Sequence, residues 1–132
     1  MIGVDANADG LALVSRKAPP NALFGRLSLD DAPGILEGVA ASVTVLMPWG
    51  SLLTAVATGD VSKLRALGGE LRIVYGTGDA DRLTLPDPMA VWGARARPMT
   101  LDEVRALPTT WAKKLAFSGH ARSFFEVVLH PT

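Results

Sequence analysis

The chain has 132 residues, no cysteine and two histidines, and its 13 basic and 13 acidic side chains give a net charge of zero. This length suits one domain, 1–132, and a composition that is 48% hydrophobic and 20% charged is typical of a globular protein. The lack of cysteine excludes disulfides and thiolate metal sites, and the spacing of His120 and His130 makes a poor metal site. No apolar run is long enough to span a membrane and no signal peptide is apparent, so we expect a cytoplasmic, metal-free protein without membrane contact.

The first half of the chain alternates short apolar runs with helical patterns. The run at 42–47 is the clearest strand, because it is β-branched and apolar and Pro48 follows it. The expected elements are a strand at 2–4 ending in Asp5, a helix at 8–17, a strand beginning at 22, an interruption of regular structure at 30–33, the strand at 42–47, and helices at 51–57 and 61–67.

The second half of the sequence predicts that the same sheet ends with antiparallel strands. Thr100 and Glu103 have the spacing of a capping box, which predicts a helix reaching Leu107. The other expected elements are a strand at 70–75, a loop at 76–88 rich in Gly, Asp and Pro, an edge strand at 90–99, a helix from 109 to 117 and a closing strand at 123–129. Strands alternating with short helices indicate an α/β domain with a mostly parallel sheet, and the last pieces favour an antiparallel ending.

Polar groups follow the first strands, where open α/β sheets bind their ligands. Asp5 is placed to accept hydrogen bonds from two ribose hydroxyls, and Ser28 and Asp30 follow the second strand where an adenine edge would lie. Taken singly, each signal is weak, because an aspartate after a strand is more often a cap or turn residue. The same positions therefore also fit ordinary turns.

Two tryptophans carry more information. Trp49 lies between proline and glycine at a strand end, and Trp111 is followed by Lys113 and Lys114. Two aromatic faces can hold a flipped base, and cations can bind its phosphates. From Val91 to Arg122 six basic residues accompany two acidic ones, a local excess of four positive charges, although ordinary surface scatter also explains this excess. On physical grounds alone, Trp49 could equally cap the end of the core.

These motifs resemble one family. The stretches 47–53, 111–117 and 122–125, together with 2–5 and 21–33 in the same order, look like the Kam/Npm family of aminoglycoside-resistance methyltransferases. The resemblance covers nearly the whole chain. It implies a Rossmann-like class I methyltransferase fold that uses S-adenosyl-L-methionine to methylate the N1 atom of a decoding-site adenine in 16S rRNA of the small ribosomal subunit.

The resemblance also implies roles for individual residues. Trp49 and Trp111 would sandwich the flipped adenine, and Thr109 would help to fix the methionine end of the cosubstrate or the target base. Lys114 stands where the family has arginine, which keeps the charge but loses the bidentate fork. The implied cosubstrate site is Asp5, Ser28, Leu29, Asp30 and Thr109, and the implied RNA contacts are Lys113, Lys114 and Arg122.

The chain departs from the family at its front. The family opens with a strand and a Gly-Thr-Gly-Asp-Gly turn, and neither precedes Asp5 here, so we expect an N-terminally truncated form of the fold that lacks this first strand and its Gly-rich turn. The run 76–79 spells Gly-Thr-Gly-Asp after a strand, and we interpret it as a turn that arose by chance. An unpaired central position in the sheet would favour self-association through exposed edges.

Two other functions stay open. The chain could be an inactive fragment, or an RNA-binding relative without methyl transfer. It could also be a small-molecule methyltransferase with a reworked pocket, although the paired tryptophans argue against that hypothesis.

Overall fold

The computed structural model describes residues 2–5, 23–26, 32–48, 50–78, 85–107 and 122–131. No helix in these ranges is long and apolar enough to cross a membrane. The strands are β1 (Ile2–Asp5), β2 (Leu23–Arg26), β3 (Ser42–Leu46), β4 (Glu70–Gly78), β5 (Ala96–Met99) and β6 (Arg122–Leu129). The helices are α2 (Ala32–Leu36), α3 (Gly50–Ala57), α4 (Ser62–Arg65), α5 (Pro88–Trp92), the 3₁₀ turn η2 (Gly93–Arg95) and α6 (Leu101–Arg105).

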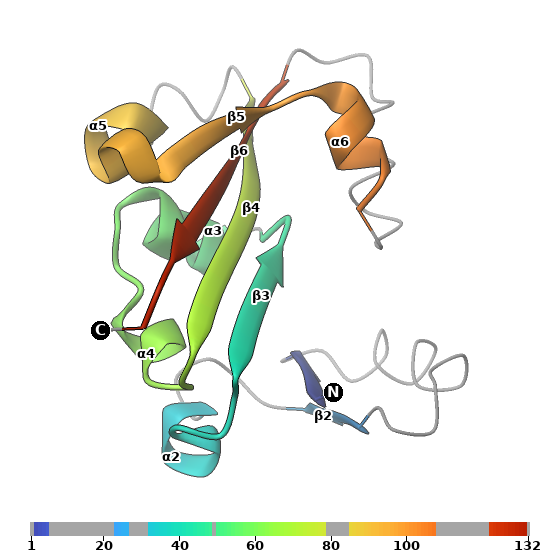
Figure 1. Cartoon of the computed structure of the whole chain (residues 1–132), viewed down its shortest axis with the longest axis vertical. Helices are drawn as coiled ribbons and strands as arrows, with labels where there is room; N and C mark the ends of the chain where they lie inside the picture. The colour runs from blue at the N-terminus through green and yellow to red at the C-terminus, as the bar shows by residue number, and fades with distance from the viewer. Residues whose placement is uncertain are drawn as a thin grey trace.

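The described strands form two sheets (Figure 1). β1 and β2 pair in parallel, and the larger sheet has the order β3-β4-β6-β5. β3 is parallel to β4, whereas β6 runs antiparallel to both β4 and β5. The sheet is therefore mixed, and both the α/β class and the antiparallel ending expected from the sequence are confirmed.

The larger sheet has a core on each face, because alternate side chains of β4 point to opposite sides. On one face Leu71, Ile73 and Tyr75 are fully buried with the residues of α3, α4 and α5. On the other face Val74 and Phe124 pack with Val104 of α6 and with its neighbours. The parallel pair β3–β4 is thus connected through α3 and α4, as the periodicity of 51–67 indicated, although α4 is shorter than expected.

The loop expected at 76–88 is wrong in its first part. Gly76, Thr77 and Gly78 continue β4 and pair with Phe124, Ser123 and Arg122 of β6. Glycine stands in this strand because a Cβ at position 76 would lie 2.8 Å from two ring atoms of Phe124. The Gly-Thr-Gly-Asp run is therefore mostly strand and not the turn that its composition indicated.

The edge strand expected at 90–99 is correct only from Ala96 onward. Before it, Pro88 at the first turn of α5 and Gly93 with a φ of 58° at its end delimit a short helix. Proline early and glycine late are the usual bounds of a helix, and here they outweigh the apolar alternation. The short helix α2 was not expected, because it begins inside the interruption expected at 30–33 and its sequence contains proline and glycine.

The capping box is confirmed. The Thr100 hydroxyl accepts from the Glu103 amide at 3.2 Å, and the Glu103 carboxylate accepts from the Thr100 amide at 3.1 Å. The helices expected at 8–17 and 109–117 lie outside the described residues.

Candidate functional site

One edge of the larger sheet gathers the ends of its strands. β3, β4 and β5 run in the same direction, so their carboxyl ends meet at the upper edge in Figure 1. β6 begins at this edge, where Arg122 is the register partner of Gly78. Open α/β sheets bind ligands outside such carboxyl ends, which makes this edge the candidate site.

A strained turn follows β3 at this edge. Met47 has a φ of 52° and is 3% exposed, and its amide donates to the Val74 carbonyl at 2.7 Å. Gly50, which begins α3, also has a positive φ of 62°. A non-glycine residue in this conformation costs about 1–2 kcal/mol, and such strain is concentrated at functional sites. Two left-handed residues thus flank positions 48 and 49.

Packing below the turn explains how this strain is held. Met47, Val74, Val104 and Phe124 share one buried cluster. The missing side chain at Gly76 leaves room for the Phe124 ring, and the Met47 methyl lies 3.6 Å from where a Cβ would be. The glycine in β4 therefore supports the turn that carries the Pro-Trp-Gly motif.

The structure places two of the site residues expected from the sequence by their backbone. Asp5 ends β1 beside Arg26 of β2, and Arg122 begins β6 at the candidate edge. The end of a strand is the position that the expected role of Asp5 requires. The remaining candidates lie outside the described residues, so their proximity stays a prediction: Ser28, Leu29, Asp30, Trp49, Thr109, Trp111, Lys113 and Lys114.

An ion-pair network ties β4, β6, β5 and α6 together on one face. Glu126 accepts from Arg72 Nε at 2.7 Å and from Arg97 Nη2 at 3.2 Å, and Arg97 Nη1 donates to Glu103 at 2.8 Å. Partial burial opposes ionisation of Glu126, but its bonds to the two arginines outweigh burial and lower its pKa. This network fixes the strands below the site and holds the carboxylates of Glu126 and Glu103 in pairs with arginine.

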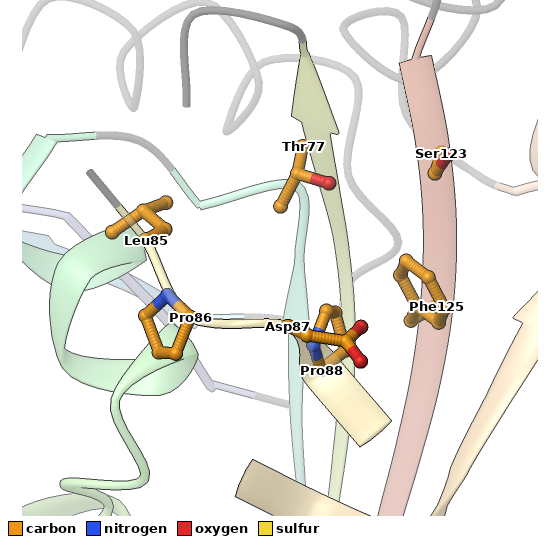
Figure 2. Close-up of a pocket in the computed structure, with 7 residues that line it drawn as sticks. All are labelled: Thr77, Leu85, Pro86, Asp87, Pro88, Ser123 and Phe125. Atoms are coloured by element: carbon orange, nitrogen blue, oxygen red, sulfur yellow. The ribbon is translucent and has the colours of Figure 1, made fainter. Parts of the chain in front are cut away.

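A pocket of about 320 Å³, which was not expected from the sequence, opens at the same edge (Figure 2). The pairing of β4 with β6 brings Thr77 together with Ser123 and Phe125, and residues 85–88 line the rest of the pocket. A signal was present, because Thr77 and Ser123 interrupt two otherwise apolar faces at register-paired positions. The pocket is lined by Thr77, Leu85, Pro86, Asp87, Pro88, Ser123 and Phe125.

Beneath this region Tyr75 is fully buried, with its ring centroid 6.3 Å from that of Phe125. Burial raises the pKa of the Tyr75 hydroxyl, and the negative charge of Asp87 raises it further. The hydroxyl therefore remains protonated and neutral below the pocket.

No protein-family model matches the sequence, and no curated protein matches it. Solved structures do match. An antibiotic-related methyltransferase is 25% identical with a TM-score of 0.75, and 98% of this chain aligns with 75% of that chain. A mutant 16S rRNA (adenine(1408)-N(1))-methyltransferase from Catenulisporales acidiphilia, solved with cosubstrate SAM, is 25% identical with a TM-score of 0.72 and coverage of 96% and 72%.

The aminoglycoside resistance methyltransferase NpmB1 is 29% identical, with a TM-score of 0.59 and coverage of 96% of this chain and 74% of that chain. The chain therefore spans about three quarters of the length of each of these structures. The resemblance found in the sequence is confirmed by the structure: the chain has a Rossmann-like methyltransferase fold and is a structural relative of the Kam/Npm-type 16S rRNA (adenine-N1) methyltransferases.

Proposed function

We propose that this protein uses S-adenosyl-L-methionine to methylate the N1 atom of a decoding-site adenine in 16S rRNA, and thereby gives resistance to aminoglycosides. The observation that carries the proposal is the likeness of 98% of the chain to a solved methyltransferase at a TM-score of 0.75. The order of the sequence motifs agrees with this likeness. The tryptophan motif, in particular, follows the strand whose end makes the strained turn at Met47.

The cosubstrate would lie at the ends of β1 and β2. Asp5 ends a strand that is paired in parallel, and its carboxylate would accept hydrogen bonds from a ribose diol there. Ser28, Leu29 and Asp30, a few residues beyond the end of β2, would contact the adenine part, and Thr109 would help at the methionine end. S-adenosyl-L-methionine would supply an electrophilic methyl group there.

The target adenine would be held by stacking. Trp49 and Trp111 would sandwich the flipped base, with Lys113, Lys114 and Arg122 on the RNA backbone. Adenine N1 carries a lone pair and needs no deprotonation before attack. Catalysis by this chain therefore consists of alignment, for which the fixed turn after β3 is suited.

A calorimetric titration of S-adenosyl-L-methionine into the 132-residue chain tests the first step. We expect binding by the native chain, and a loss of at least about tenfold in affinity for Asp5→Ala, because a charge-assisted pair of hydrogen bonds disappears. Asp60→Ala, at an exposed position between α3 and α4, is the matched control and should bind as the native chain does. No binding by the folded native chain would favour the inactive or RNA-binding alternative.

Methylation of isolated small ribosomal subunits tests the second step. Trp49→Ala and Trp111→Ala should each lower kcat/KM by about tenfold or more, because a stacked base loses about 1–3 kcal/mol. Trp49→Phe keeps an aromatic face and should retain most of the activity. Equal activity of the alanine and phenylalanine variants would contradict the sandwich, and activity on a small molecule but not on subunits would favour the reworked-pocket hypothesis.

The protein would act in the cytoplasm, where its RNA substrate is found. It would also self-associate through β3, which in the described part of the chain pairs with β4 alone. Sedimentation velocity would then show dimers that Thr44→Lys weakens, because a charged residue on an edge strand opposes pairing; a native chain that sediments only as a monomer would contradict this.

A further inference from the structure

The pocket in Figure 2 is polar where the rest of its sheet face is apolar. The inward residues of β4 are Leu71, Ile73 and Tyr75 until Thr77, which is buried at 4% exposure. On β6 the same face ends in Ser123, the register partner of Thr77. Two hydroxyl groups therefore stand side by side at the end of an otherwise apolar surface, as they do in sites that orient a ligand.

Asp87 supplies a carboxylate that its own helix does not use. It occupies the N-cap position of α5, where aspartate usually binds a backbone amide, yet its side chain makes no capping hydrogen bond. Figure 2 shows the carboxylate directed toward Phe125 instead. Its backbone is fixed by Pro86 and Pro88 on either side and by hydrogen bonds from the amides of Ala90 and Val91 at 3.0 and 3.2 Å. The carboxylate is thus presented from a rigid support.

Phe125 provides an aromatic surface beside this carboxylate. Its ring lines the pocket, is only partly buried, and rests against the buried ring of Tyr75 at 6.3 Å. An aromatic ring held in this way suits a flat ligand, and stacking of a base on such a ring contributes about 1–3 kcal/mol.

The residues that line the pocket limit the chemical class of its ligand. Of the described residues that line the pocket, one is acidic and none is basic, which favours a ligand group rich in N–H donors. A volume of about 320 Å³ accommodates a nucleoside. Guanine presents two adjacent donors, N1–H and the 2-amino group, which a carboxylate accepts in bidentate fashion, whereas uracil flanks its one N–H with two carbonyls.

We propose that this pocket binds a second, unpaired nucleobase of the RNA substrate, and that it selects guanine. Asp87 accepts from the Watson–Crick edge, Phe125 stacks on the ring, and the Thr77 and Ser123 hydroxyls bond the remaining polar edge. The proposal rests on the proposed function for its RNA substrate. It adds a specificity site on the same edge of the sheet as the turn at Met47.

The test is a titration of GMP and of UMP into the isotope-labelled 132-residue chain, followed by the amide NMR shifts of Thr77, Ser123 and Phe125. The two nucleotides share ribose and phosphate, so a difference in affinity reports the base. We expect GMP to bind at least about fivefold more tightly than UMP, with Asp87→Asn removing this difference. Asp102→Asn, on the exposed surface of α6, is the control and should preserve it.

A second variant separates stacking from edge recognition. Phe125→Leu should weaken both nucleotides to a similar degree and keep the preference for GMP. Equal affinities in the native chain, shifts confined to other residues, or an unchanged preference in Asp87→Asn would each overturn the proposal. The experiment needs neither the cosubstrate nor methyl transfer, so its failure leaves the proposed methylation standing, and failure of methylation leaves the base selectivity measurable.

Discussion

β3 and β4 are parallel neighbours with similarly apolar sequences, yet they differ in burial. In β4 the side chains of Leu71, Ile73, Val74 and Tyr75 are at most 1% exposed, whereas no side chain of β3 from Ser42 to Leu46 is buried to that degree. β4 lies between two strands, and β3 has one strand beside it in the described part of the chain. The comparison teaches that apolar composition identifies a strand, but that its neighbours decide how much it contributes to stability.

The largest expected effect comes from separating the two strands at their start. Gly69 has a φ of 52°, and a Cβ there would overlap the carbonyl of Ala41, next to the Glu70–Ala41 hydrogen bond of 3.1 Å. Gly69→Ala should therefore cost about 3 kcal/mol or more of the free energy of unfolding, measured by urea denaturation. Gly34→Ala, with open space around its Cβ, is the control and should change stability by less than about 1 kcal/mol. A small effect at both positions would mean that this turn is loosely held.

Two matched substitutions measure how much burial in β3 and in β4 contributes to stability. Val74→Ala removes a fully buried side chain from β4 and should cost about 2–3 kcal/mol, whereas Val45→Ala in half-buried β3 should cost about half as much. Both variants lose the same atoms, so the ratio of the two losses of unfolding free energy reports the neighbours alone. Equal losses of unfolding free energy would show that β3 is covered in solution. Self-association through the edge of β3 would cover it in this way.

The smallest effect concerns the charged face. Burial opposes ionisation of Glu126, but Arg72 and Arg97 lower its pKa, so its contribution to stability is full above the unfolded-state pKa of about 4.3 and is lost as the pH falls through the lower folded-state value. Glu126→Gln should cost about 1 kcal/mol at pH 7 and less at pH 3, measured by thermal unfolding at both values. A loss that is the same at pH 3 would indicate a packing effect instead of a charge effect.

The sequence correctly predicted the elements whose local sequence pattern agrees with their packing in the folded structure. The strand at 42–47, the helix at 51–57, the capping box at Thr100 and the closing strand at 123–129 all appear within one or two residues. The error at residues 76–78 comes from a contact that is distant in the sequence. Gly76 looks like a turn residue, and only the ring of Phe124, far along the chain, explains why glycine stands in a strand.

Some residues of the candidate site could likewise be predicted from the sequence, and others could not. Asp5 and Arg122 follow from a motif and a strand end, and both are strand-end residues in the structure. Asp87 belongs to no motif, and Phe125 lies in the stretch 122–125 but had no expected role there. The two residues line one pocket only in the folded chain, and no local pattern encodes their proximity. The stacking residues Trp49 and Trp111 remain a prediction from the resemblance.

The strand order has a consequence for synthesis of the chain. β6 lies between β4 and β5, although both of these strands precede it in the sequence. A chain that leaves the ribosome from its N-terminus therefore exposes one edge of β4 and the whole of β5 until residues 122–129 emerge. Because this pairing joins residues far apart in the sequence, folding should be slow and should benefit from chaperones that shield the waiting edges. The larger sheet of a protein proposed to act on ribosomes would thus stay open until residues 122–129 have left its own ribosome.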